Sequence, residues 1–127
     1  MTTRTILADT VAYLGTLLDG YEVKYFRWTD ADESSDTPFV MLRFPGGGGA
    51  SNVILQQLDV LLALVQTPTG AVTGHDDMSA ILAKVRQGGG QNTVTRFEPM
   101  GSLSGPQYLE NGRPVWTLNI RCYTEDY

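Results

Sequence analysis

The chain has 127 residues, enough for one domain and too few for two. Hydrophobic residues make up 42% and charged residues 18%, a composition that excludes a disordered or fibrous chain. Fourteen acidic residues against nine basic ones give a formal charge of −5, and this disfavours nucleic-acid binding through phosphates, which requires clustered Lys and Arg. With one His and one Cys, the chain cannot build a disulfide framework or a Cys/His zinc site alone. We predict a single domain over residues 1–127.

Neither a membrane span nor a secretion signal is predicted. The longest uncharged core-like run, Val60–Val65, is far shorter than the roughly 20 residues that a membrane-spanning helix needs. No basic region precedes an apolar stretch at the N-terminus. We therefore expect a soluble protein made in the cytoplasm.

The first predicted element is a helix over Thr3–Asp19, because apolar residues recur there with helical spacing. Thr2 or Thr3 is expected to cap its start, and Gly20 to close its end. An alternating aromatic run, Tyr21–Trp28, then predicts a strand, and a slip of its apolar phase predicts a β-bulge or a strand covered on both faces. The helix stripe comprises Ile6, Leu7, Val11, Leu14, Leu17 and Leu18, with Arg4, Asp9 and Thr16 off it.

The middle of the chain is predicted to form a long β-hairpin. The polar stretch Thr29–Thr37 is expected to be a solvated loop, and Pro38 to open the strand Phe39–Phe44. For the apolar segment Asn52–Gln66, helix and strand interpretations compete. We favour a strand, since Pro45 and the glycines that follow it set up a hairpin back onto the preceding strand. The glycine run consists of Gly46, Gly47, Gly48 and Gly49.

A second amphipathic helix is predicted over Gly74–Gly88. Asp76 or Asp77 is expected to cap its start, where negative charge faces the positive end of the helix dipole. Three glycines end it. Its apolar stripe consists of Met78, Ile81, Leu82 and Val85.

The remaining chain is predicted to be β. Thr93–Phe97 is a short strand, and Met100–Gln107 is a connection rich in Gly, Ser and Pro. Asn111-Gly112, a dipeptide typical of a type I′ turn, separates Tyr108–Glu110 from the last strand, Arg113–Tyr123. That strand alternates, with Trp116, Leu118, Ile120 and Cys122 on the buried face and Thr117, Asn119 and Arg121 on the polar face.

This order of elements predicts an α+β fold. Two helices with one apolar stripe each can both pack on one face of an antiparallel or mixed β-sheet, which we expect to have about four to five strands and a long β-hairpin.

The candidate chemical motifs have simpler structural interpretations. No Gly-Lys-Ser/Thr follows Gly46–Gly49, so a hairpin tip is favoured over a phosphate loop. The acidic stretch Asp30–Asp36 has oxygen-bearing side chains at alternate positions, as a calcium-binding loop does. Ser35 and Met41, however, occupy the positions where an EF-hand needs Gly and Glu. A solvated acidic loop is therefore favoured over weak cation binding. His75 is expected near a helix start on the surface, and Cys122 in the core. We therefore do not expect Cys122 and His75 to act together as a catalytic nucleophile and its general base.

The aromatic residues of Tyr21–Trp28 are expected to pack in the core or at a subunit interface rather than on bases, because few cations accompany them. We predict no catalytic residue, no cofactor and no metal site. The predicted hairpin Phe39–Gln66 is longer than two helices can cover, so its edges are predicted to pair with a neighbouring subunit. The sequence therefore favours an assembly protein over an enzyme.

The layout resembles the bacteriophage tail terminator family, also described as minor tail protein U-like or tail completion proteins. The resemblance rests on the N-terminal helix that leads into Tyr21–Trp28, the strand PFVMLRF, the helix DDMSAILAKVRQ and the closing hairpin NGRPVWTLNIRCY. It implies an α+β virion subunit that closes into a homo-oligomeric ring, usually a hexamer, on the head-proximal end of the tail tube. Such a ring stops tube polymerisation and offers a surface to a head-tail connector or head-completion protein.

The same resemblance implies localisation in the virion tail, with assembly in the host cytoplasm and with DNA passing non-specifically through an acidic lumen. No residue is carried over from the family. From expected exposure alone, the candidate ring-face or lumen elements are the acidic loop Thr29–Thr37, the glycine tip Pro45–Asn52 and the connection Gly101–Pro106. The long strand supplies candidate subunit contacts. The candidate interface residues are Asp30, Asp32, Glu33, Asp36, Gly46, Gly47, Gly48, Gly49, Gln56, Gln57 and Asp59.

Two alternatives stay open at this stage. The nearer one is another phage neck, head-tail connector or tail-tube-like ring subunit. The more distant one is a small cytosolic enzyme or ligand-binding domain that uses the acidic loop together with His75. An enzyme would lose turnover when these polar side chains are replaced by amides, whereas an assembly subunit would still form its ring.

Overall fold

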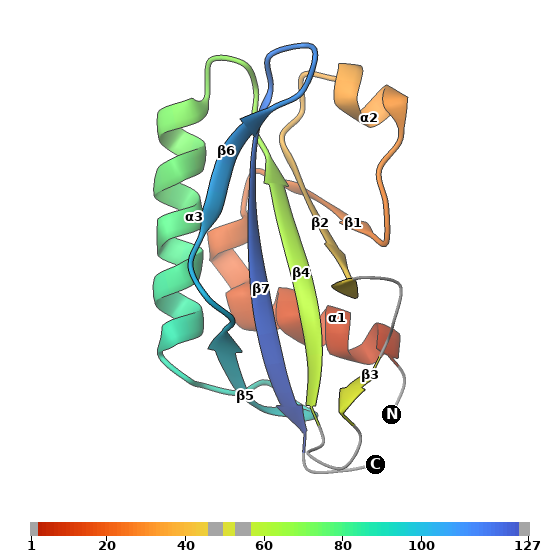
Figure 1. Cartoon of the computed structure of the whole chain (residues 1–127), viewed down its shortest axis with the longest axis vertical. Helices are drawn as coiled ribbons and strands as arrows, with labels where there is room; N and C mark the ends of the chain where they lie inside the picture. The colour runs from red at the N-terminus through yellow and green to blue at the C-terminus, as the bar shows by residue number, and fades with distance from the viewer. Residues whose placement is uncertain (1–2, 46–49, 53–56, 125–127) are drawn as a thin grey trace.

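The computed structural model describes residues 3–45, 50–52 and 57–124 (Figure 1). Its centre is a seven-stranded mixed sheet with the strand order β1-β2-β4-β7-β5, in which β3 also pairs with β4 and β6 also pairs with β7. The helical elements are α1 (Thr3–Leu14), the 3-10 turn η1 (Gly15–Leu18), α2 (Asp30–Ser34) and α3 (Ala71–Arg86). The strands are β1 (Glu22–Tyr25), β2 (Phe39–Arg43), β3 (Ala50–Asn52), β4 (Gln57–Val65), β5 (Val94–Pro99), β6 (Ser104–Tyr108) and β7 (Pro114–Thr124).

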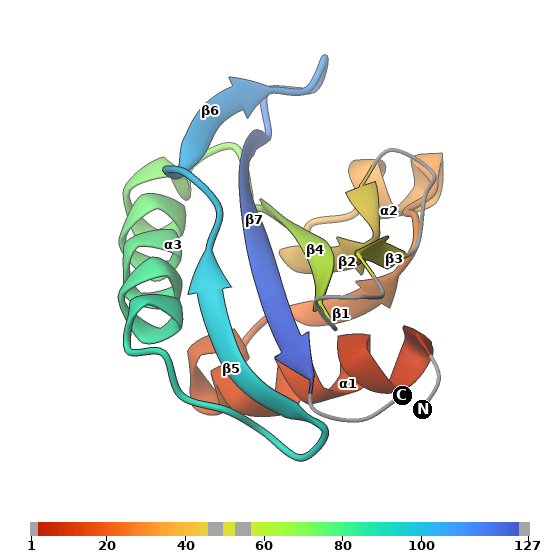
Figure 2. The same ribbon diagram turned by 60° about the horizontal axis from the view of Figure 1, so that its bottom comes forward.

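Helices α1 and α3 pack on the same face of the sheet. Ile6 of α1 and Ile81 of α3 are fully buried in one apolar cluster with Leu62 of β4 and Leu118 of β7. Figures 1 and 2 show that α1 runs across the strands whereas α3 runs along them. The predicted α+β fold is confirmed. The sheet has more strands than predicted and is mixed because β1 pairs with β2 in parallel.

The predicted hairpin is confirmed over the described residues. β2 and β4 are antiparallel, with Phe39 opposite Val65 and Arg43 opposite Leu61. The strand interpretation therefore holds for Gln57–Val65. The expectation of an uncovered hairpin edge is wrong, because β4 lies between β2 and β7 and pairs with both. The glycine tip, 46–49, lies outside the described residues.

The first helix has the predicted extent but two segments, since α1 ends at Leu14 and η1 continues to Leu18. Gly20 closes it with φ of 87°, a left-handed conformation that glycine adopts at low cost. Thr3 already lies in the helix, and Thr2 lies outside the described residues.

Asp9 departs from its predicted position off the buried stripe. Its side chain is buried, with 5% relative exposure, and accepts hydrogen bonds from Thr93 Oγ1 at 2.6 Å and Asn92 Nδ2 at 3.0 Å. The carboxylate thereby ties α1 to the turn before β5, and hydrogen bonding compensates its burial.

The phase slip in the aromatic run has a cause other than the predicted bulge or two-sided cover. β1 ends at Tyr25, and Phe26 adopts a left-handed conformation with φ of 74°. Its backbone nitrogen still donates to Leu42 O at 2.9 Å. One left-handed residue rotates the following chain, so the apolar phase changes at that point. A bulky residue with this backbone is unusual.

α3 begins three residues before the predicted start. Gly70 occupies the N-cap position without a side-chain cap, so neither Asp76 nor Asp77 caps the helix as predicted. The turn at Thr67–Gly70 is closed by a hydrogen bond from Gly70 N to Thr67 O of 2.9 Å, and it starts the helix instead. The predicted stripe is confirmed, because Met78 and Ile81 are fully buried.

The C-terminal strands contain two corrections. The predicted connection Met100–Gln107 includes strand β6, whose five residues are all exposed. The hairpin around Asn111-Gly112 is confirmed, but its turn is not type I′, because only Gly112 has a positive φ, 86°. Leu109 instead exchanges hydrogen bonds with Gly112 and Arg113, as in a three-residue loop that ends in a left-handed glycine. The alternation of β7 is confirmed.

Gly74 lets α3 approach the sheet. A Cβ atom at this position would lie 2.4 Å from Cζ3 of Trp116, a fully buried side chain that cannot move aside. We expect Gly74→Ala to lower the free energy of unfolding by about 1–3 kcal/mol, despite the higher helix propensity of Ala. Urea denaturation measures this loss. The exposed neighbour variant Thr73→Ala is the control and should change stability little; equal stability of both variants would contradict the close packing.

Candidate functional site

The acidic segment between β1 and β2 is a short capped helix, not the solvated loop that was predicted. Thr29 and Asp32 form a capping box, in which Asp32 N donates to Thr29 Oγ1 at 3.3 Å and Thr29 N donates to Asp32 Oδ2 at 2.8 Å. Lys24 Nζ lies 2.9 Å from Asp32 Oδ1. The hydrogen bond from the Thr29 backbone, followed by that from Lys24, lowers the pKa of Asp32. This carboxylate therefore has a local structural role.

Arg113 fixes the acidic segment to the rest of the fold. Its side chain is almost fully buried, with 1% relative exposure, and lies over the Phe39 ring at 5.3 Å. Among the described residues, the guanidinium donates to five backbone carbonyl oxygens. Nε donates to Gln66 at 3.0 Å, and Nη2 donates to Thr37 at 2.8 Å. Nη1 donates to Asp32 at 2.8 Å, to Glu33 at 3.0 Å and to Ser35 at 2.8 Å. Desolvation lowers the pKa of Arg113, and these carbonyls compensate the buried charge.

A second contact joins the acidic segment to the β6–β7 hairpin. Asn111 Nδ2 donates to Glu33 O at 2.6 Å, next to the bonds made by Arg113. α2 and the hairpin therefore form one end of the molecule, visible at the top of Figure 1. The carboxylates of this end differ in availability: Asp30 and Asp36 are exposed, whereas Glu33 accepts from Trp28 Nε1 at 2.8 Å.

The candidate contacts on the long strand are less exposed than predicted. Gln57 is buried, with 7% relative exposure, so the expectation that it is exposed is wrong. Asp59 is half-buried and accepts from Arg121 Nε at 2.9 Å and Nη2 at 3.4 Å across β4 and β7. Gln56 lies outside the described residues. Whether Gln57 and Asp59 meet another subunit stays a prediction.

His75 and Cys122, the two residues examined for nucleophilic chemistry, lie far apart in the fold. His75 is exposed on α3, whereas Cys122 is fully buried on β7 and its Sγ lies 3.8 Å from Thr10 Oγ1. Burial raises the pKa of the Cys122 thiol to about 12. The predicted positions of both residues are confirmed.

Asp77, two residues after His75, is hydrogen-bonded by a side chain from another part of the chain. Tyr21 Oη donates to Asp77 Oδ2 at 2.5 Å and accepts from Gln66 Nε2 at 2.9 Å. Burial, followed by the Asp77 carboxylate, raises the pKa of Tyr21. Asp76 has no such partner among the described residues and is exposed.

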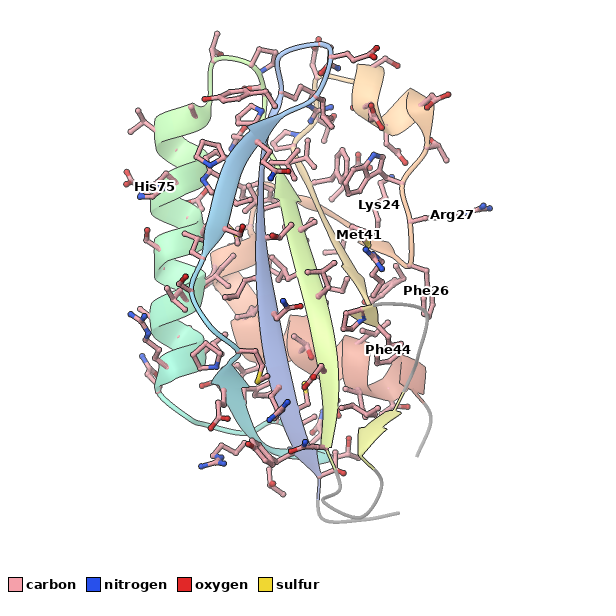
Figure 3. The ribbon with its side chains drawn as sticks, in the orientation of Figure 1. Lys24, Phe26, Arg27, Met41, Phe44 and His75 are labelled. Carbon is pink, nitrogen blue, oxygen red and sulfur yellow. The ribbon has the colours of Figure 1, made fainter. Side chains whose placement is uncertain are left out.

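An exposed aromatic and cationic surface, the Phe26 knob, consists of Phe26 and Arg27 after β1. With Trp28, Met41 and Arg43, these two residues also border a depression of about 230 Å³. Phe26 is 46% exposed, and its ring centroid lies 6.4 Å from that of Phe44. Arg27 is exposed and points away from the ribbon (Figure 3). Behind the knob, Met41 is buried on the face of β2 that the large helices do not cover. The aromatic run therefore divides, because Tyr21 and Tyr25 pack against the core whereas Phe26 faces outward.

A depression of about 260 Å³, the α3–β6 cleft, lies between the start of α3 and β6. Val72 at its rim is 76% exposed, although it is apolar. The Trp116 indole reaches from α3 to β6, because added Cβ atoms at Gly74 and Gly105 would lie 2.4 Å from Cζ3 and 3.3 Å from Cδ1. Among the described buried side chains, Trp116 Nε1 is the donor without a hydrogen-bond partner. The cleft is lined by Ala71, Val72, His75, Asp76, Pro106 and Trp116.

The described part of the chain shows neither a metal-binding cluster nor a membrane-spanning helix. No group of three or more His, Cys, Asp and Glu side chains within residues 3–45, 50–52 and 57–124 is arranged to hold a metal ion. Nor does any helix in those ranges combine the length and apolar character needed to cross a membrane.

The described residues form an α+β fold with the two large helices on one face of the sheet. The sequence model of the phage tail termination protein family matches residues 4–126. The chain therefore belongs to this family, which makes it a structural component of phage tail assembly. A search of the curated proteins found none that matches the chain.

The Arg113 contacts generate a stability prediction. Arg113→Met keeps the apolar stem but leaves five carbonyl oxygens without their charged donor, so we expect a loss of about 3 kcal/mol in the free energy of unfolding. Urea denaturation measures the loss, and amide hydrogen exchange should accelerate over residues 30–37. Arg86→Met, at an exposed position of α3, serves as the control. If both variants have the same free energy of unfolding, Arg113 does not anchor the acidic segment, residues 30–37.

The buried thiol generates a second prediction. With its pKa raised to about 12, only about one Cys122 thiol in a thousand would ionise at pH 9 in the folded chain. We expect Ellman's reagent to leave the native chain unmodified at pH 8.5 and to modify it fully in urea. Because the thiol ionises more readily in the unfolded chain than in the folded one, the free energy of unfolding should fall as the pH rises from 9 towards 12. Rapid modification of the native chain would contradict the core position.

Proposed function

We propose that this chain closes into a homo-oligomeric ring on the head-proximal end of the tail tube, stops tube polymerisation there and provides the surface that joins the head. The match to the phage tail termination family over residues 4–126 carries the proposal. A ring requires a head-to-tail contact that closes by rotation, and a cap requires two unlike axial faces. The partners would be other copies of this chain, the tail tube protein and a head-tail connector or head-completion protein.

The fold offers a rigid end for an axial contact. Arg113 and Asn111 hold the acidic segment to the β6–β7 hairpin, so the exposed carboxylates of Asp30 and Asp36 keep fixed positions. A preorganised surface binds a partner without a large ordering cost. We therefore propose this acidic end as a ring-face element, with Asp32 and Glu33 supporting it through their internal contacts.

Side-chain surfaces are better suited to subunit contacts than strand addition. β6 is an exposed strand at the margin of the sheet, but Pro106 lacks a backbone N–H and restricts its pairing with a further strand. β4 already pairs on both sides. Strand addition at β4 or β6 is therefore disfavoured, and we propose that the ring closes through side-chain contacts between neighbouring subunits.

Tube growth in the presence of the purified chain tests the proposal. Substoichiometric chain added to polymerising tail tube protein should shorten the tubes, because each bound ring removes a growing end. Electron micrographs of labelled chain should place the label at one end of each tube. Unchanged tube lengths, or label along the sides, would contradict termination.

The acidic end is tested in the same assay. Asp30→Asn/Asp36→Asn should still form the ring but should terminate tubes at higher chain concentration, since a ring-face contact is weakened. Asp19→Asn removes an exposed carboxylate elsewhere and is the matched control. If the double variant and the control terminate tubes equally well, the acidic end is not part of the tube contact.

A further inference from the structure

The Phe26 knob and the α3–β6 cleft face opposite sides of the molecule. Figure 3 labels Phe26 and Arg27 on one side of the sheet and His75, in the cleft, on the other. The knob therefore cannot fill the cleft of its own chain. A head-to-tail contact between identical subunits joins two different surfaces of the same chain, and the knob and the cleft are two such surfaces.

The two surfaces are complementary in size and polarity. A cavity of roughly 150 Å³ binds benzene, so the cleft of about 260 Å³ has room for one phenyl ring. Phe26 carries an exposed ring, and exposed Val72 supplies an apolar wall for it.

The charges at the two surfaces are also complementary. Arg27 follows Phe26 on the knob, and Asp76 lies at the cleft. Both side chains are exposed, and neither forms an ion pair with another described residue. When the ring of Phe26 enters the cleft of a neighbour, an ion pair between Arg27 and Asp76 would orient the two subunits. The left-handed backbone at Phe26 directs this bulky side chain outward at the end of β1, although a glycine would adopt that conformation more readily.

We propose that the Phe26 knob of one copy of this chain inserts into the α3–β6 cleft of the next copy, with Arg27 paired to Asp76 across the contact. The inference rests on the proposed ring and names the surfaces that close it. The occupant of the cleft is a second copy of this chain because the knob that fits it lies on the opposite side of the same molecule.

A charge exchange tests the contact. Arg27→Glu and Asp76→Arg should each reduce ring formation at least tenfold in apparent affinity, and the double variant Arg27→Glu/Asp76→Arg should recover most of the loss. Arg86→Glu and Asp19→Arg make the same charge changes at exposed positions outside the two surfaces and should assemble normally. Sedimentation velocity and native mass spectrometry measure the assembly, with tail tubes present where the free chain is monomeric.

A second variant separates assembly from folding. Phe26→Gly removes the phenyl group of Phe26 but favours the left-handed backbone at this position. The circular dichroism spectrum should therefore stay that of a folded chain, while assembly into the oligomeric ring is lost. Val72→Asp should block the cleft in the same assay. A mixture of the Phe26→Gly and Val72→Asp chains should give at most pairs. The intact knob of the Val72→Asp chain can bind the intact cleft of the Phe26→Gly chain, and the pair then has no intact knob or cleft left for a third chain.

The possible outcomes distinguish this inference from the proposed function. Rings that form normally in all the knob and cleft variants would overturn the contact and leave termination standing. Rings that form normally but no longer stop tube growth would assign the cleft to the tube protein and also overturn it. A wild-type chain that forms no ring, alone or on tubes, would contradict both the contact and the proposed function.

Discussion

The buried guanidinium of Arg113 is the interaction on which the shape of one end of this protein depends. Five backbone carbonyls from two separate segments converge on it, and the Phe39 ring covers its flat face. A polar, acidic stretch could not bury enough apolar surface to order itself. Its backbone is ordered instead by a cation delivered from the β6–β7 hairpin. An otherwise solvated segment thus becomes a fixed surface bearing exposed carboxylates.

The regular elements follow from local patterns. The apolar stripe of α3 and the alternation of β7 were predicted from spacing, because each element buries a single face. The buried role of Arg113 could not be predicted, since its acceptors are main-chain atoms far away in the sequence. The helix α2 had one local signal, the Thr29 and Asp32 capping box, which the strongly polar composition outweighed. The left-handed Phe26 had only an indirect signal, the slip of the apolar phase in the aromatic run, and such a slip fits a β-bulge equally well.

The candidate surfaces show the same division. Exposure of Asp30 and Asp36 follows from their polarity, whereas the burial of Gln57 follows from its place on a strand paired on both sides. The α3–β6 cleft joins residues from three elements, so it exists only after folding. Gly74 and Trp116 bring α3 close to the sheet, and β6 forms the other wall. The chain belongs to the phage tail termination family, and we propose that these surfaces make its contacts with other tail components.

The central claim is that this chain acts as a closed ring of identical subunits at one end of the tail tube. A cryo-electron microscopy reconstruction of a tube end bound by the chain tests it most directly. We expect a single closed layer in which Phe26 of each subunit lies against Val72 and Pro106 of the next. A chain absent from the tube end, or stacked in repeated layers along the tube, would contradict it.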